Sequence, residues 1–361
     1  MSIILVMEIH GNTPEYFYNI EIILMFEGSI MQAAFRNGKK TFIRDVQLGP
    51  LAEGEVRVQV SACGVCGTDL HENPAETGKD LPFGHEIAGV IRELGPGVSG
   101  LKIGQAVALD SSTACGVCES CRNTEQELCQ NQKGFWQAES LGMAEEMIAP
   151  AISCLPYEGL TPDLACLQEP LGVAIDMIRL SGIGVDSNVL VVGPGAVGLM
   201  ALALARRAGA RRIFLSASPD NKERIRVARA FGADEVIDRK KLLDCDFGCR
   251  IDRILVTAPP PAIHDAMAVA AKGGIITFIG IGYGEAAFCR FDVNAFHFKK
   301  LQLRASFASP ALFGPRALQY LREGVVDGAA LISHRFRLAE ISQAVTMARD
   351  TKQSVKVVVT P

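Results

Sequence analysis

The sequence lacks an excess of positive charge, a long uninterrupted apolar run and internal repeats. Its formal net charge is −4, so no nucleic-acid partner and no membrane surface are expected. The longest apolar stretch, residues 189–205, is interrupted by three glycines and a proline, which argues against a membrane span. The N-terminus has no basic segment before its first apolar residues, so no targeting signal is predicted.

The 361 residues are enough for two domains, and their cysteines favour metal binding over disulfides. Several of the 11 cysteines cluster with C-x2-C spacing in a large chain, which is typical of ligation. This use of cysteine predicts a reducing compartment, the cytoplasm. Six others are expected to be small buried hydrophobes: Cys63, Cys154, Cys166, Cys245, Cys249 and Cys289.

The first part of the chain predicts an extension followed by a β-rich domain. Residues 1–30 contain two short apolar runs that differ from the rest, and form either an upstream extension or an added element packed on the surface. A regular pattern begins at Met31. Short alternating segments such as 55–60 and 86–91, separated by glycine turns, predict a barrel-like β domain over residues 31–180.

The pattern then changes to alternating strands and helices over residues 181–311. Strands at 189–192 and 212–216 are each followed by a helix, at 196–207 and 222–231. Such alternation predicts an α/β fold with a doubly wound parallel sheet. Residues 312–361 form a separate tail, with expected helices and a last strand.

A glycine-rich turn opens the first of these helices. It consists of Gly193, Pro194, Gly195, Ala196, Val197 and Gly198, which read G-x-G-x-x-G between a strand and a helix. The first glycine permits the tight turn, the second lets a pyrophosphate approach, and the third allows close helix packing. The helix N-terminus then faces the phosphates, so a nicotinamide dinucleotide site is predicted.

The next strand, which ends at Ala217, lacks the carboxylate that binds the ribose of NAD. Ser216 and Ser218 could bond a 2′-phosphate instead, with Lys222 or Arg224 supplying charge. This pattern favours NADP over NAD. The alternative is that the cations only line a solvated helix face.

Two sets of metal ligands precede this turn. Four thiols fall within 15 residues and can close a tetrahedron around a structural Zn²⁺: Cys115, Cys118, Cys121 and Cys129. Cys66 with His85 and Glu86 leaves a coordination position open, as in a catalytic site. The acidic balance argues against the rival interpretation of the four-cysteine segment as a nucleic-acid-binding zinc ribbon.

The residues from Cys63 to His71, Gly84-His85-Glu86 and the four-cysteine segment resemble the zinc-containing medium-chain alcohol and polyol dehydrogenases. The resemblance runs from about Met31 to the C-terminus. It implies a GroES-like catalytic domain into which a Rossmann domain is inserted, with the tail returning to the catalytic domain. It also implies two Zn²⁺ per chain, a small-molecule substrate and a homo-oligomer, either a dimer or a tetramer.

The same resemblance implies roles for individual residues. Cys66 and His85 would hold the catalytic zinc beside Glu86, and Asp69 would orient the histidine. Glu169, in a Gln-Glu-Pro-Leu context, resembles the glutamate of the sorbitol-dehydrogenase-like branch, which binds either zinc or the zinc-bound water. Cys166 is the alternative ligand that simple alcohol dehydrogenases would use.

Thr68 and His71 complete the expected chemistry. Thr68 would start a proton relay and His71 would carry the proton towards solvent, unless it is a plain surface histidine. The leading hypothesis is a zinc-dependent dehydrogenase of a secondary alcohol, of polyol, sugar or cyclitol type, using NAD(P). The alternatives are a primary or aromatic alcohol dehydrogenase or aldehyde reductase of this fold, and a non-catalytic zinc- and nucleotide-binding protein.

Overall fold

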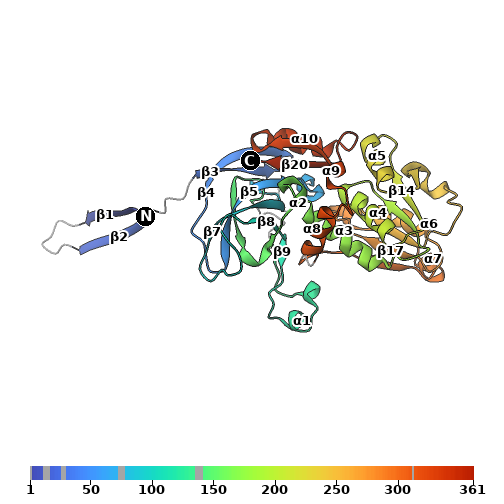
Figure 1. Cartoon of the computed structure of the whole chain (residues 1–361), viewed down its shortest axis with the longest axis horizontal. Coiled ribbons are helices and arrows are strands. Elements are labelled where there is room, and N and C mark those ends of the chain that lie inside the picture. The colour runs from blue at the N-terminus through green and yellow to red at the C-terminus, as the bar shows by residue number, and fades with distance from the viewer. Residues whose placement is uncertain (1, 11–16, 26–29, 72–77, 135–140, 311–312) are drawn as a thin grey trace.

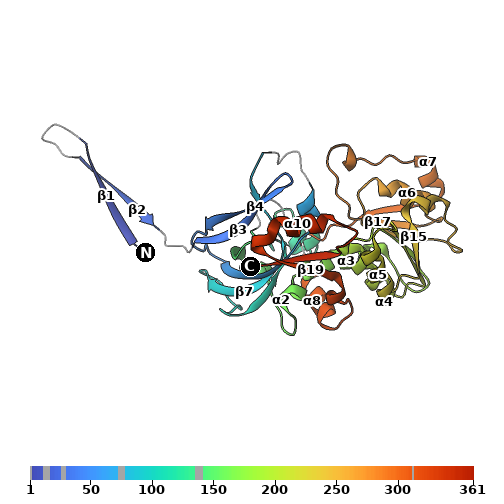
Figure 2. The same cartoon turned by 90° about the horizontal axis from the view of Figure 1, so that it is seen from above.

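The computed structural model describes residues 2–10, 17–25, 30–71, 78–134, 141–310 and 313–361. Two antiparallel strands, β1 (Ser2–His10) and β2 (Phe17–Met25), make up the described part of the N-terminal extension. Figures 1 and 2 both show this hairpin projecting away from the remaining molecule. Ile30, the last residue of the predicted extension, begins β3, and residues 1, 11–16 and 26–29 lie outside the described residues.

The β-rich part is built on a seven-stranded sheet in the order β12-β8-β7-β5-β20-β19, with β11 also paired to β5. In β5, Val56, Val58 and Val60 are buried and alternate with half-exposed polar residues. Each buried valine contributes about 1.5–3 kcal/mol of hydrophobic stabilisation. The strands are β5 (Glu55–Gly64), β7 (Glu86–Leu94), β8 (Ala106–Leu109), β11 (Glu146–Pro150), β12 (Cys154–Pro156), β19 (Ile332–Arg337) and β20 (Lys356–Thr360).

Smaller elements surround this sheet. A three-stranded sheet has the order β4-β3-β6, and β9 pairs with β10 beside a lobe that Figure 1 shows below the sheet, at α1. Their bounds are β3 (Ile30–Asn37), β4 (Lys40–Gln47), β6 (Leu81–Pro82), β9 (Ser112–Thr113), β10 (Lys133–Gly134) and α1 (Glu119–Arg122). Short 3₁₀ turns are η1 (Gly67–Leu70), η3 (Gln126–Leu128), η4 (Ala151–Ser153), η5 (Arg239–Asp244), η6 (Gly284–Ala287) and η7 (Leu338–Glu340).

The predicted doubly wound sheet is confirmed. Six strands, all parallel, follow the order β15-β14-β13-β16-β17-β18. From β13 the chain first adds strands on one side, β14 and β15, and then crosses to add β16, β17 and β18 on the other side. Val189 and Val191 pack into one hydrophobic cluster and Leu190 and Val192 into another, so β13 is buried on both faces. The strands are β13 (Asn188–Val192), β14 (Arg212–Ala217), β15 (Glu235–Asp238), β16 (Arg253–Val256), β17 (Ile275–Phe278) and β18 (Gln302–Ala305).

Helices cover this sheet and join it to the β-rich part. Around the parallel sheet lie α4 (Ala196–Arg207), α5 (Lys222–Ala230), α6 (Ala262–Val269) and α7 (Val293–Phe298). The others are α2 (Pro162–Ala165), α3 (Gln168–Ser181), α8 (Gly314–Arg322), α9 (Gly328–Leu331) and α10 (Ile341–Arg349). Among the helices of the described residues, none has the length and apolarity that crossing a bilayer requires.

Helix α3 connects the two parts of the molecule and packs against α4 and α8. At its C-terminal end Gly182 has φ 62°, a left-handed conformation that stops the helix. The carbonyls of Leu180 and Gly182 accept hydrogen bonds from Arg304 on β18 (2.6 Å) and Arg253 on β16 (3.1 Å). Two cations therefore fix the negative end of the helix dipole to the parallel sheet.

Three of the six cysteines predicted to be buried hydrophobes are buried: Cys63, Cys154 and Cys166. The prediction was wrong for Cys245, Cys249 and Cys289, which are partly exposed. They lie in connecting segments of the parallel-sheet domain, where the backbone runs near solvent.

Candidate metal and nucleotide sites

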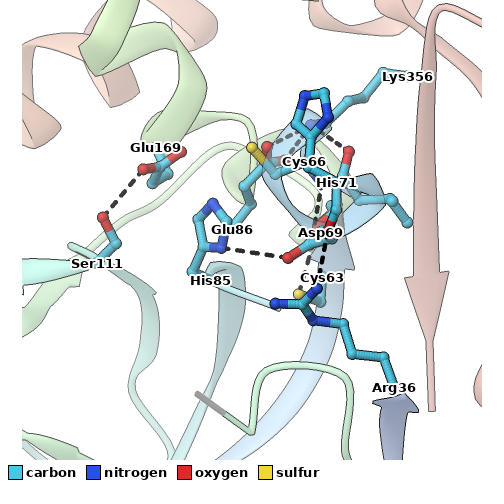
Figure 3. A network of polar contacts seen from close by, with 12 residues as sticks. Arg36, Cys63, Cys66, Asp69, His71, His85, Glu86, Ser111, Glu169 and Lys356 are labelled. Carbon is cyan, nitrogen blue, oxygen red and sulfur yellow. Dashed lines mark hydrogen bonds and ion pairs between the residues drawn. The ribbon is translucent and has the colours of Figure 1, made fainter. Parts of the chain in front are cut away.

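Three of the predicted metal ligands come together beside β5 (Figure 3). Cys66 follows β5 and caps η1, while His85 and Glu86 stand at the start of β7, which pairs with β5. One ligand atom from each residue lies within 4.8 Å of the others. His85 and Glu86 are buried, whereas Cys66 is partly exposed. A thiol, an imidazole and a carboxylate at this separation fit a zinc ion.

Asp69 lies beside His85 as a charged neighbour. Its Oδ2 accepts a hydrogen bond from the Cys66 backbone N–H at 2.9 Å, and its Oδ1 lies 3.7 Å from His85 Nδ1. Nδ1 thus faces Asp69 and Nε2 remains for a metal. Burial lowers the pKa of His85, but the charges of Cys66 and Asp69 outweigh it and raise that pKa well above its usual value. Acidic side chains therefore surround the imidazole, as is typical of a cation site.

Glu86 has a partner that the sequence analysis did not single out. Its carboxylate forms a buried ion pair with Lys356 on β20, whose Nζ also donates to the Val65 carbonyl at 2.9 Å. Burial lowers the pKa of Lys356, but Glu86 and Cys66 outweigh it and raise the pKa above its usual value. A lysine inside the apolar run from Val355 to Val359 was the available signal, because a buried ammonium requires a partner.

The two candidates for a further ligand lie outside this group. Glu169, in the first turn of α3, accepts a hydrogen bond from Ser111 Oγ at 3.0 Å, as Figure 3 shows. Burial raises the pKa of Glu169, while nearby His85 lowers it. The Cys166 thiol is fully buried and donates to the Asp163 carbonyl at 3.2 Å. In this geometry neither side chain joins the ligand atoms of Cys66, His85 and Glu86.

Thr68 and His71 line a cleft of about 500 Å³ that also reaches the glycine-rich turn at Gly195. Thr68 Oγ1 is buried and has no hydrogen-bond partner within the described part of the chain. His71 is exposed, and its ring centroid lies 6.5 Å from that of Tyr283 in an edge contact. The predicted relay residues and the nucleotide turn therefore share one cavity.

The three glycines of that turn meet the spatial demands predicted for them. A Cβ on Gly195 would have no atom within 4 Å, so the backbone is open to a ligand. A Cβ on Gly198 would lie 2.2 Å from the Gly193 carbonyl and 2.6 Å from Thr257 Oγ1. Gly193 itself has φ 111°, which favours glycine. Helix α4 begins at Ala196, followed by Val197, and Pro194 lines a second cavity.

The second cavity, of about 810 Å³, extends from this turn past the end of β14. Ser216, Ser218 and Arg224 all line it, as the sequence predicted for a cofactor site. Ser216 Oγ is buried without a hydrogen-bond partner in the described residues, and Arg224 Nε donates to the Ser354 carbonyl at 2.8 Å. Arg239 and Lys240, which follow β15, also line this cavity and were not predicted. Only tertiary structure brings β15 beside β14.

The four-cysteine lobe has the dimensions of a zinc site. Cys115 Sγ lies 4.0 Å from Cys121 Sγ, and Cys118 Sγ lies 3.9 Å from Cys129 Sγ. A tetrahedron with Zn–S bonds of about 2.3 Å has edges of about 3.8 Å. Backbone N–H groups point at the sulfurs and lower the pKa of Cys118 to about 6, whereas burial raises that of Cys121 to about 12. The donor set and its spacing fit Zn²⁺.

Comparisons with known proteins agree with this geometry. Residues 52–159 match the family model described as alcohol dehydrogenase GroES-like domain, and residues 196–320 match that of zinc-binding dehydrogenase. The chain is 29% identical to L-idonate 5-dehydrogenase of Vitis vinifera, over 87% of this chain and 89% of that protein. It is 30% identical to sorbitol dehydrogenase of Arabidopsis thaliana, over 84% and 87%.

A solved structure has the same fold with a nucleotide bound. The zinc-binding dehydrogenase of Sinorhizobium meliloti 1021 bound to NADP superposes with a TM-score of 0.80 at 25% identity. The alignment covers 92% of this chain and all of that one (100%). The predicted combination of a GroES-like domain and a Rossmann domain is confirmed.

Proposed function

The chain belongs to the zinc-binding alcohol dehydrogenases, and on that basis we propose that it transfers a hydride between NADP and a secondary alcohol of a polyol, sugar or sugar acid. The observation that carries the proposal is the shared cleft. Cys66 and Thr68 line it together with Gly195 and Gly198 of the glycine-rich turn. Substrate and nicotinamide can therefore meet beside the metal ligands.

Cys66 and His85 are the proposed ligands of the catalytic zinc, with Glu169 or Glu86 as the third protein group. A zinc ion bound there supplies a Lewis acid for the substrate oxygen. Asp69 keeps Nε2 of His85 directed at the site. Because Lys356 already compensates the charge of Glu86, Glu169 is the better candidate for a carboxylate that exchanges with substrate.

Thr68 Oγ1 is proposed to relay the hydroxyl proton of the alcohol: it accepts that proton as its own hydroxyl proton leaves towards His71. It lines the cleft and has no competing partner among the described residues. His71, exposed at the same cleft, then passes the proton to solvent. In the direction of carbonyl reduction the same atoms return the proton.

The substrate proposal rests on Glu169 and on the relatives. Its Gln-Glu-Pro-Leu context is that of the polyol branch, and the buried Cys166, bonded to Asp163, does not offer the alternative thiolate. The named relatives act on L-idonate and on sorbitol, a sugar acid and a polyol. Primary or aromatic alcohols remain the second candidate class, to be tested beside these.

The cofactor proposal is NADP rather than NAD. Ala217 stands where a ribose-binding carboxylate would repel a phosphate, and Arg224, Arg239 and Lys240 surround the same cavity. We expect Arg239→Ala to raise KM for NADP about tenfold, as for the loss of one charge-assisted hydrogen bond, and to leave KM for NAD almost unchanged.

We further propose a second, structural zinc in the four-cysteine lobe. We also propose the reducing cytoplasm as the compartment, because it keeps these thiols from forming disulfides. The 11 cysteines of the described residues form no disulfide.

A dimer is proposed through the open edge of the parallel sheet. One edge strand of this sheet is β18. Phe288, Val293, Phe298 and Phe307, in the segments flanking it, are more than half exposed. An unpaired edge beside exposed aromatics suits an isologous contact. Light scattering of the protein and of Phe298→Asp tests this.

The experiment that tests the function is a screen of absorbance at 340 nm. Zinc-replete protein is assayed with NAD and NADP separately against polyols, sugars, sugar acids, cyclitols and simple alcohols. We expect turnover of a secondary alcohol that disappears in Cys66→Ala. If protein that holds zinc and binds cofactor turns over none of these compounds, the third hypothesis, a non-catalytic binding protein, replaces this one.

A further inference from the structure

Two consecutive residues after β8 hold two consecutive residues at the start of α3. Gln168 Nε2 donates to Asp110 Oδ1 at 2.7 Å, and Ser111 Oγ donates to Glu169 Oε1 at 3.0 Å. Asp110, Ser111 and Gln168 are each at most 8% exposed. Water therefore has little access to the Gln168–Asp110 bond, whereas Glu169 itself is partly exposed. The two bonds together form a double clasp.

The clasp fixes the backbone of α3 at its first turn. The N-terminus of α8 packs directly against it, because a Cβ on Gly314 would lie 2.6 Å from both Asp110 Oδ1 and Gln168 Nε2. There is no room for Gln168 to move outward. The position of Glu169 can consequently change only through its own side-chain torsions.

The Glu169 carboxylate has two competing partners. In this structure it is bonded to Ser111 and stands apart from the ligand atoms of Cys66, His85 and Glu86 (Figure 3). A bond from a hydroxyl to a carboxylate is charge-assisted and stronger than a neutral one. To reach a metal at Cys66 and His85, the Glu169 carboxylate has to move away from the position in which Ser111 holds it.

We propose that Ser111 is a positioning residue that holds Glu169 withdrawn from the metal, which keeps a coordination position open for the substrate oxygen. The proposal rests on the function proposed above, in which Cys66 and His85 hold the catalytic zinc. Asp110 and Gln168 fix the start of α3, and with it the distance of the Glu169 backbone from Cys66 and His85.

The test compares Ser111→Ala with Ser112→Ala in the full-length, zinc-replete protein. Ser112 is an equally buried neighbour whose hydroxyl pairs with Ser309 Oγ at 2.7 Å instead of Glu169. Zinc ion is the probe, and its retention is measured against a competing chelator. Without the Ser111 bond Glu169 should occupy the metal more fully, so Ser111→Ala should retain catalytic zinc about tenfold more tightly, or about 1.4 kcal/mol.

Two further readouts separate positioning from a general structural effect. KM for the alcohol should rise in Ser111→Ala, and the visible spectrum of the Co²⁺-substituted protein should change, while Ser112→Ala matches wild type in both. In a Glu169→Ala background, Ser111→Ala should no longer alter zinc retention. Ser111→Gly removes the same hydroxyl and replaces the alanine variant if the latter fails to fold.

Equal or weaker zinc retention in Ser111→Ala than in Ser112→Ala overturns the proposal. So does an effect of Ser111→Ala that persists without Glu169. Cys66→Ala identifies failure at the earlier step: if it releases no zinc, the proposed metal centre is wrong, whatever Ser111 does.

Discussion

Replacing Lys356 with methionine should destabilise the β-rich domain strongly. Methionine nearly matches the length of lysine but leaves the Glu86 carboxylate without its cation and Val65 without its donor. Glu86 and Lys356 are 1% and 4% exposed, so solvent cannot substitute for either partner. Removing one member of a buried pair typically costs about 3–5 kcal/mol.

The charge, rather than packing, should account for most of that loss. A double variant, Lys356→Met with Glu86→Gln, leaves no buried ion and should recover at least about half of the difference. The pKa of Lys356 is raised in the fold, so its contribution is fully present below the unfolded pKa and is lost only as pH rises through the folded one. The effect of Lys356→Met should therefore be constant from about pH 7 to about pH 9.

Urea unfolding followed by circular dichroism, at fixed free zinc, measures these differences. Fixed zinc is needed because bound metal adds its own stabilisation. A single variant within about 1 kcal/mol of wild type would refute the reasoning, as would a double variant no more stable than the single one.

Three other predictions follow from buried groups and close contacts. Asp110→Asn should stabilise the protein by about 1–3 kcal/mol at pH 8, because burial raises the pKa of Asp110 to about 7 and its ionisation destabilises the fold. The gain should shrink as pH falls from 7 and vanish below about pH 4, which unfolding curves across that range would check. Gly195→Ala should leave the melting temperature almost unchanged but weaken binding of the nicotinamide dinucleotide, whereas Gly198→Ala should lower both; calorimetric melting beside cofactor titration distinguishes them. Cys121→Ser should remove one equivalent of zinc and expose the lobe around α1 to proteolysis while Cys66 still binds metal; unchanged zinc content by elemental analysis would contradict this.

The sequence predicted best what is encoded locally. The four cysteines and the glycines of the nucleotide turn are close in the chain, and their spacing alone restricts how they can fold. His85 and Cys66 required two motifs to be combined, and the pairing of β5 with β7 brings them together.

Partners that are distant in the chain could not be predicted in the same way. Lys356 is paired with Glu86 across 270 residues, and Arg239 meets the Ser218 region only because β15 lies beside β14. Ser111 had no sequence signal, since its role depends on which rotamer Glu169 adopts. These side-chain partners and rotamers are determined by tertiary packing, which cannot be read from a short sequence motif.

Helix α3 links the candidate metal site to the parallel sheet. It is 14 residues long, about 21 Å, with Glu169 at one end and carbonyls clamped by Arg304 and Arg253 at the other. The C-terminal end of the helix is thus fastened to the parallel sheet that carries the glycine-rich turn, and Glu169 lies at the opposite end. A tilt of about 5° at that sheet would move the far end by about 2 Å, comparable to a metal–ligand bond length. The same helix therefore spans the distance between the parallel sheet and the Glu169 carboxylate beside the candidate metal ligands.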